Sequence, residues 1–299
     1  MLISLISAKG SPGVTTTTLA VASRWSRPAV VVDADPLSGD MLAGVGAGRI
    51  PAAANLMELM VAARTVGMAD ALADQLVRPG GEHCPPFVPG LGAPGQAAGL
   101  AWEKLAAGLT SVPWADVLAD CGRYGTAPTP LPMLRHSELV VLLVGSCLRS
   151  VRAAQRSVPV IRAELTRAGG VADHLVAVVV DPGQPYGQSE IAEALELPVI
   201  AWLPHDPPTA AVWSDGADPG RGFARSPLQR AAAHLAAQLM SLATQRQAWL
   251  DGSRRPRTPP DVPAQAGLVG LVPGGEWPVI PAPTTPANGM RRSRSEGGS

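Results

Sequence analysis

The first 25 residues constrain the fold more than any other part of the chain. A run of aliphatic residues and serines, Leu2–Ser7, leads into a glycine-containing loop, which opens directly into the helix-forming stretch Thr15–Trp25. In a strand–loop–helix unit of this kind, loop amides and the helix N-terminus can face an anion. Gly10 and Gly13 permit the backbone conformations that such a loop needs. The segment predicts an α/β protein with an anion site after its first strand. A plain turn with threonine caps is the alternative.

Apolar runs and helix-forming stretches alternate along the rest of the chain. Several apolar runs are continuous, as in strands that are buried on both faces. We expect strands at Leu2–Ser7, Ala29–Asp33, Asp116–Asp120, Leu139–Val144, Leu175–Val180 and Val199–Leu203. We expect helices at Thr15–Trp25, Met41–Met60 with breaks, Gln96–Thr110, Arg149–Arg167, Ser189–Leu195 with Ser189 as its cap, and Pro227–Trp249. This alternation predicts a doubly wound, mainly parallel α/β sheet.

The composition changes near residue 250. Residues 1–250 are expected to form one domain, whereas Pro, Gly, Ser and Arg dominate residues 251–299. A segment of that composition buries too little apolar surface to fold alone, which predicts a disordered tail. Its two apolar islands, Gly267–Val272 and Trp277–Ile280, are alternatively short docking motifs.

Charge and apolar patterning narrow the class of protein. Lys+Arg and Asp+Glu both number 24, so no global field draws the chain toward nucleic acid or an acidic membrane. No apolar run reaches the roughly 18 residues of a spanning helix, and Met1–Ala8 is expected to be a strand rather than a signal peptide. The three cysteines have no zinc or disulfide spacing. We therefore expect a cytoplasmic protein with small-molecule or protein partners.

The glycine-containing loop resembles the deviant Walker A motif of the ParA/MinD family, usually KGGxGK[S/T]T. The matching residues are Lys9, Gly10, Gly13, Thr15 and Thr16. The resemblance covers residues 1–245 and implies the P-loop NTPase fold with ATP and Mg²⁺ as cofactors. It assigns the nucleotide phosphates to the loop residues and the magnesium ion to Thr15. In the family, the lysine at the position of Lys9 reaches the phosphates of a partner subunit, which implies a homodimer and a catalytic role for Lys9. A solvated loop lysine is the alternative.

Two loop positions depart from that motif. Ser11 replaces a glycine, and Val14 stands where the family has its phosphate-gripping lysine. A hydrogen bond to a charged group is worth roughly 1.5–3 kcal/mol, so this loss lowers nucleotide affinity by about ten- to a hundred-fold. Phosphoryl transfer is expected to suffer more, because charge develops on the phosphate in the transition state.

Four further strand ends resemble the family's site. Asp35 lies in a segment like DxDPxxGN and would position the attacking water, while Asp120 ends a strand like Walker B and would hold magnesium. Cys121-Gly122-Arg123 then stands where the family has small residues and proline, and the role of Arg123 is open. Asp181 and Pro204 follow two later strands and would border the base.

The resemblance implies a spatial organiser of chromosomes, of the division site, or of pilus and secretion machinery as in TadZ/CpaE-like proteins. The degenerate loop favours weak or absent ATP hydrolysis, with function through dimerisation and a protein partner. A working ATPase switch is the alternative, and a metabolic enzyme like CobQ or BioD is less favoured.

Other partners are less favoured by the sequence. DNA could bind arginines such as Arg221, Arg225 and Arg230, although a solvated helix face explains them equally well. The Pro- and Gly-broken tail offers no amphipathic helix, so we expect no direct membrane anchor.

Overall fold

The computed structural model describes residues 1–9, 13–37, 40–45, 54–78, 83–167, 172–181 and 186–252. Of residues 40, 172, 251 and 252 it describes the backbone alone. The predicted tail and its two apolar islands lie almost wholly outside these ranges. The description that follows therefore concerns the N-terminal unit, Met1–Asp261.

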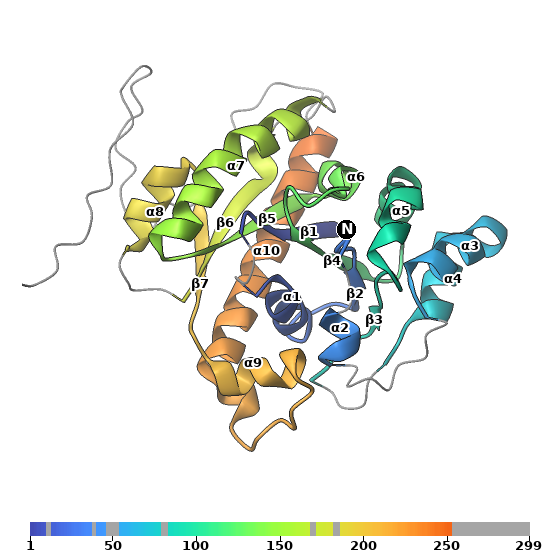
Figure 1. The fold of residues 1–299 in the computed structure, drawn as a ribbon, viewed down its shortest axis with the longest axis horizontal. Helices are drawn as coiled ribbons and strands as arrows, with labels where there is room; N and C mark the ends of the chain where they lie inside the picture. The colour runs from blue at the N-terminus through green and yellow to red at the C-terminus, as the bar shows by residue number, and fades with distance from the viewer. Residues whose placement is uncertain are drawn as a thin grey trace, which may run out of the picture. The chain divides into compact units, whose positions relative to one another are not determined.

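The described residues form a seven-stranded parallel sheet (Figure 1). Its strands are β1 (Leu2–Ser7), β2 (Ala29–Asp33), β3 (Phe87–Val88), β4 (Asp116–Arg123), β5 (Leu139–Gly145), β6 (Leu175–Val180) and β7 (Val199–Leu203). Their order is β3-β2-β4-β1-β5-β6-β7, and every neighbouring pair is parallel. The continuous apolar runs of the sequence are the strands, because both faces of this sheet are buried. The predicted doubly wound parallel fold is confirmed.

Helices cover both faces of the sheet (Figure 1). They are α1 (Val14–Ala22), α2 (Asp40–Ala43), α3 (Leu56–Val66), α4 (Met68–Gln75), α5 (Trp102–Thr110), α6 (Leu131–His136), α7 (Leu148–Arg167), α8 (Gln188–Leu195), α9 (Pro207–Ser214) and α10 (Pro227–Gly252). Ile3 and Leu5 of β1 pack in one core with residues of α1, α9 and α10. Ser4 lies between them in sequence and donates a hydrogen bond to the carbonyl of Met133 in α6 at 3.3 Å. Because successive side chains of β1 point to opposite faces of the sheet, α1 and α6 cover opposite faces.

Two sequence predictions about helices need correction. The cap predicted at Ser189 is wrong, because α8 begins at Gln188 and Gly187 is its N-cap. Glu190 accepts a hydrogen bond from the Gly187 amide at 2.8 Å, which satisfies a free amide at the start of the helix. The helix expected at Gln96–Thr110 is two elements, a 3₁₀ helix at Pro94–Gly99 followed by α5.

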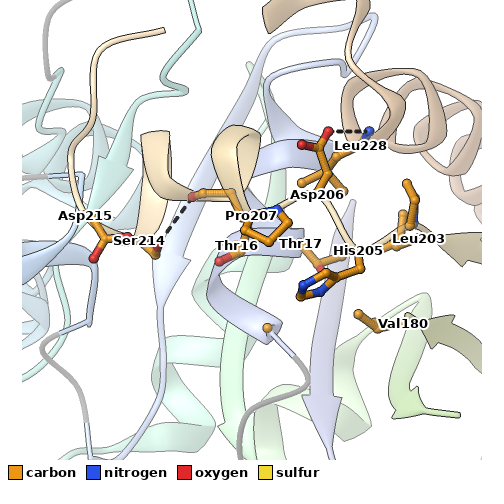
Figure 2. A pocket seen from close by; sticks show the side chains of 13 residues that line it. Thr16, Thr17, Val180, Leu203, His205, Asp206, Pro207, Ser214, Asp215 and Leu228 are labelled. Atoms are coloured by element: carbon orange, nitrogen blue, oxygen red, sulfur yellow. Dashed lines mark hydrogen bonds between the residues drawn. The ribbon is translucent and has the colours of Figure 1, made fainter. Parts of the chain in front are cut away.

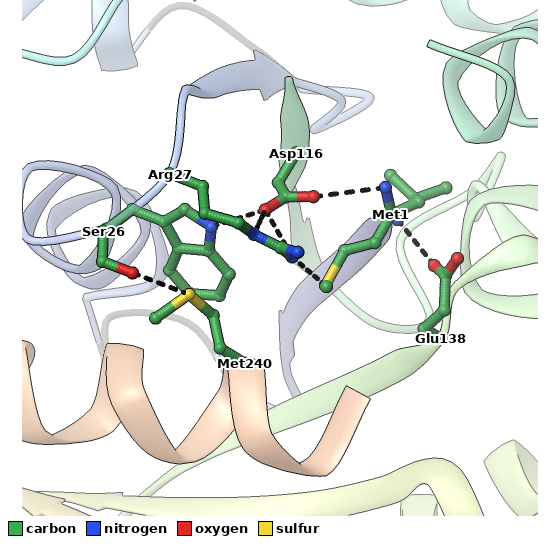
Figure 3. Close-up of polar contacts among 8 residues, drawn as sticks. Met1, Ser26, Arg27, Asp116, Glu138 and Met240 are labelled. Atoms are coloured by element: carbon green, nitrogen blue, oxygen red, sulfur yellow. Dashed lines mark hydrogen bonds and ion pairs between the residues drawn. The ribbon is translucent and has the colours of Figure 1, made fainter. Parts of the chain in front are cut away.

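A buried aspartate joins three segments at the amino ends of β1 and β4 (Figure 3). One carboxylate oxygen of Asp116 accepts hydrogen bonds from the Trp25 indole and from Nε of Arg27, both at 2.8 Å. Its other oxygen lies 3.3 Å from the ammonium group of Met1. The Asp116 side chain is 10% exposed, so these two cations offset the cost of burying its charge.

The structure also answers whether the described helices could span a membrane and whether the cysteines are paired. Within the described ranges, no helix combines the length and the hydropathy that crossing a membrane requires. The three cysteines are free thiols, of which Cys84 and Cys121 are buried and Cys147 is exposed. Burial raises the pKa of Cys84 to about 12, which keeps that thiol protonated at neutral pH.

Candidate functional site

The anion loop ends in a left-handed glycine. Gly13 is the N-cap of α1 with φ 75° and ψ 45°, a conformation that side chains disfavour. Its carbonyl accepts the first helical hydrogen bond, from the Thr17 amide at 2.9 Å. The start of α1 therefore presents free amides at the carboxyl edge of the sheet. Gly10 and Ser11, which were predicted to contact phosphate, lie outside the described residues, whereas Lys9 is described and exposed.

The structure brings together the two residues predicted to hold magnesium. The Thr15 hydroxyl, from the first turn of α1, donates to Oδ2 of Asp120 at 2.5 Å. Asp120, in β4, is 1% exposed, and its Oδ1 accepts the Gly122 amide at 2.9 Å. A hydroxyl and a carboxylate beside a helix N-terminus are the protein ligands that P-loop proteins offer to a hydrated, phosphate-bound Mg²⁺.

Two more aspartates lie beside Asp120. Asp33 is its register partner on β2, and Asp35 follows two residues later. A side-chain carbon added at Gly122 would lie 1.9 Å from Oδ2 of Asp35, so the Asp35 carboxyl rests against the Gly122 backbone. Burial raises the pKa of the intervening Cys121, and the charges of all three aspartates raise it further. Three carboxylates thus converge at this end of the sheet.

Val14, at the position of the motif's lysine, is a core residue. Its side chain is 7% exposed and packs in the core that α1 shares with the sheet. Its carbonyl accepts a hydrogen bond from the Thr18 hydroxyl at 2.9 Å. At the position of the missing lysine, the chain therefore has an apolar side chain that stabilises the start of α1.

A pocket of about 330 Å³ opens beside the start of α1 (Figure 2). The volume is within the usual range for small-molecule sites. Its lining comes from α1, the ends of β6 and β7, α9 and the start of α10. The lining residues are Gly13, Thr16, Thr17, Val180, Leu203, Pro204, His205, Asp206, Pro207, Ala210, Ser214, Asp215 and Leu228.

Asp206 holds two helices at the wall of this pocket. Its Oδ1 accepts the Thr209 amide at 3.3 Å and caps α9, while its Oδ2 accepts the Leu228 amide at 3.2 Å at the start of α10. Burial opposes ionisation of Asp206, but hydrogen bonds from Thr209, Leu228 and Ser226 outweigh it and lower its pKa. Asp206 therefore remains an anion at neutral pH, and both of its oxygens already accept hydrogen bonds.

The pocket includes some predicted residues and omits others. Thr16 and Pro204, which were predicted to contact phosphate and base, line it. Asp181 follows Val180, the last residue of β6, and has φ 57°, yet it is exposed and is not among the lining residues. Sequence reasoning missed Asp206, although an aspartate before two prolines is a typical helix start. Asp215 and Ser214 carried no such signal.

The described carboxylates do not form a self-sufficient metal centre. Within the described ranges, no group of three or more His, Cys, Asp or Glu side chains is arranged to hold a metal ion. Thr15 and Asp120 alone provide two ligands, so a magnesium ion here would need water and phosphate oxygens to complete its six positions. The residues present fit a metal that arrives with a nucleotide.

Comparisons with known proteins rest on structure. No protein-family model and no curated protein matches the sequence. The septum site-determining protein MinD of Pyrococcus horikoshii OT3, complexed with Mg-ADP, matches with a TM-score of 0.63 and 18% identity, over 82% of this chain and 98% of that one.

Two further solved structures match over similar lengths. A ParA family ATPase of Chlorobium tepidum TLS has a TM-score of 0.60 at 13% identity, covering 80% of this chain and 99% of that one. The MinC:MinD cell division protein complex of Aquifex aeolicus has a TM-score of 0.60 at 16% identity, covering 81% and 96%. These matches, at 13–18% identity, show that the chain has the fold of the ParA and MinD proteins.

Proposed function

We propose that this chain is a ParA/MinD-like spatial organiser that binds a nucleotide weakly and hydrolyses it slowly or not at all. It acts as a homodimer that recruits a protein partner. The processes that fit are chromosome partitioning, placement of the division site, and positioning of pilus or secretion machinery.

The burial of Val14 carries this proposal. The two residues that fit magnesium are kept, with the Thr15 hydroxyl 2.5 Å from Asp120, whereas the neighbouring lysine position is filled by a core side chain. Loss of that cation weakens phosphate binding and removes charge stabilisation from the transition state of hydrolysis. The result is a site that binds nucleotide but catalyses its hydrolysis poorly.

Different described residues would contact the phosphates, the base and the magnesium ion of the nucleotide. Gly13 and Thr16 face the phosphates with the amides of the first turn of α1. Val180, Leu203 and Pro204 provide apolar contacts for the base, as is usual in small-molecule sites. Magnesium, held through Thr15 and Asp120, would neutralise phosphate charge when bound.

Partner binding is supported by the fold and by Lys9. The Aquifex aeolicus structure is a MinC:MinD complex, so a protein of this fold assembles with a partner. Lys9 is exposed at the end of β1, where it is accessible to a second subunit. DNA is a less favoured partner. Arg221, Arg225 and Arg230 are exposed and could contact phosphates, but the chain has no net charge that would draw it to nucleic acid.

One observation favours the alternative of an active ATPase. Asp35 lies against Gly122, one residue from Cys121 and two from Asp120, so a carboxylate able to orient water stands near the magnesium pair. This alternative predicts ATP turnover that depends on Asp35. The proposal predicts turnover that does not change in the Asp35→Ala variant.

The test combines calorimetry, phosphate release and light scattering on the purified full chain. Wild type, Asp35→Ala and Lys9→Ala are compared with ATP, ADP and Mg²⁺. We expect weak ATP binding, no Asp35-dependent turnover, and a dimer that Lys9→Ala weakens. Sustained turnover that Asp35→Ala abolishes would establish the alternative. A monomer at every concentration and with every nucleotide would refute the proposed organiser.

A further inference from the structure

The end of β4 contains one more residue than the strand beside it. Leu5 pairs with Asp120, but Ser7 pairs with Arg123, so two steps along β1 match three along β4. Gly122 lies within this extra step and has φ 61°. Such a bulge redirects the side chains that follow it, and bulges are common next to active sites.

The extra residue changes which face of the sheet Arg123 occupies. In a regular strand, Asp120 and Arg123 would lie on opposite faces, because side chains alternate. One added residue reverses that alternation and places Arg123 on the face of Asp120, the face that α1 covers. The neighbour Tyr124 faces the other side, where burial and the nearby Glu164 carboxylate of α7 raise its pKa.

Arg123 is also adjacent to the end of β1. Its register partner Ser7 is the last residue of β1, and the Tyr124 amide donates to the Ser7 carbonyl at 2.8 Å. The Arg123 side chain is exposed, and across the described ranges it makes no hydrogen bond or ion pair. Among the described residues, the Arg123 guanidinium therefore has no partner, and it stands beside the end of β1, on the side of the magnesium pair.

The charges at the carboxyl edge of the sheet indicate a role for the Arg123 guanidinium. Three carboxylates converge here, and the lysine position of the loop is occupied by Val14. A triphosphate would add further negative charge, which needs a cation in place of that lysine. Arginine offers a planar pair of donors that matches phosphate oxygens.

We propose that Arg123 binds the terminal phosphate of the nucleotide and supplies the positive charge that Val14 cannot. This assignment rests on the proposed nucleotide-binding function. Because Arg123 follows Asp120, beyond the magnesium pair, it contacts the γ-phosphate rather than the phosphates nearest the ribose. ATP therefore depends on Arg123 more than ADP does.

The experiment measures ATP and ADP affinity with Mg²⁺ by calorimetry for wild type, Arg123→Ala, Arg123→Lys and Arg64→Ala. Arg64 is an exposed arginine of α3 and serves as the matched loss of charge. We expect Arg123→Ala to weaken ATP binding by about ten- to a hundred-fold and ADP binding less. Arg123→Lys should be intermediate, and Arg64→Ala should equal wild type. Thermal melts confirm that each variant is folded.

The outcomes separate this inference from the proposed function. If wild type binds ATP and Arg123→Ala binds it equally, or loses ATP and ADP equally, the role of Arg123 is refuted and the organiser proposal stands. Asp35-dependent turnover with a weakened Arg123→Ala variant would retain Arg123 and replace slow hydrolysis by the active switch. If wild type binds neither nucleotide, Arg123 and the nucleotide part of the proposed function are both refuted.

Discussion

Asp116 and Asp120 are four residues apart on β4 and lie at opposite ends of the sheet. Both are buried, with relative exposures of 7% and 1%. Asp116 is paired with a guanidinium and an ammonium group and also accepts an indole hydrogen bond. Asp120 accepts hydrogen bonds from a hydroxyl and an amide and lies beside two other aspartates.

The difference indicates what each end of the sheet contributes. At the amino end, opposite charges meet and offset the cost of burial, which stabilises the fold. At the carboxyl end, like charges gather, which costs free energy unless a cation binds. In parallel α/β sheets, ligands bind at the carboxyl end. The repulsion between the carboxylates is therefore located where a bound cation would relieve it.

Removal of Asp116 is expected to have the largest effect on stability. Asp116→Ala leaves the Trp25 indole without its acceptor and Arg27 without its partner, which costs about 3 kcal/mol. Urea unfolding of the full chain measures this loss, and nucleotide affinity should not change. Asp116→Asn is the control, since it keeps one acceptor and should cost less. A loss below about 1 kcal/mol would show that this cluster does not stabilise the fold.

Val14→Lys restores a cation to the carboxyl end. We expect ATP affinity to rise by about ten- to a hundred-fold, because the ammonium group can reach the phosphates from the first turn of α1. Val14→Ala is the matched control, since it loses the same core packing without gaining charge. Calorimetry that found both variants equal to wild type would show that a missing cation does not limit binding.

Asp206 is an anion at the carboxyl end that has partners, as Asp116 has at the amino end. Asp206→Ala removes hydrogen bonds at the starts of α9 and α10 and should cost about 1–2 kcal/mol. If the place of an aspartate in the sheet, rather than its hydrogen-bond partners, decided its contribution to stability, Asp206→Ala would leave the free energy of unfolding almost unchanged.

The same residue gives a pH dependence. The folded-state pKa of Asp206 is below its ordinary value of 3.8, so the ionised carboxylate stabilises the fold above that value. This contribution is lost as the pH falls below 3.8 through the folded-state pKa. The stability difference between wild type and Asp206→Asn, measured by urea unfolding, should therefore be constant near neutral pH and shrink in acid.

Asp120→Asn is expected to have the smallest effect on stability, within about 1 kcal/mol, because relief of like charge offsets the weaker acceptor. Its effect should appear in binding instead, as a loss of the magnesium dependence of ATP affinity. Titrations with and without Mg²⁺ measure that dependence. A loss of stability equal to that of Asp116→Ala would remove the distinction between the two ends.

The sequence predicted the sheet well because the signal was local. β1, β2, β6 and β7 begin and end at the expected residues, since each is a short, mostly aliphatic run. β3 was missed because its two residues lie among prolines and pair with β2 far away in the sequence. α9 was missed; it begins with Pro207 and Pro208, which fit the first turn of a helix although proline disfavours later turns.

The candidate site was predictable where a motif named the residue. Thr15 and Asp120 were paired in advance through the family resemblance, and they are in contact. The Asp116 cluster was not predictable, because its partners are 115, 91 and 89 residues away. The burial of Val14 depends on how α1 packs on the sheet, which one position in a motif does not reveal.

The extra residue in β4 also limits how this chain can change by insertion and deletion. Removal of one residue between Asp120 and Arg123 would restore the regular register with β1. Arg123 and Tyr124 would keep their faces, because Arg123 would then stand two residues from Asp120 in a regular strand. A single deleted codon at this point would therefore remove the bulge and keep the polarity of the strand end, whereas loss of both residues between Asp120 and Arg123 would move Arg123 to the opposite face.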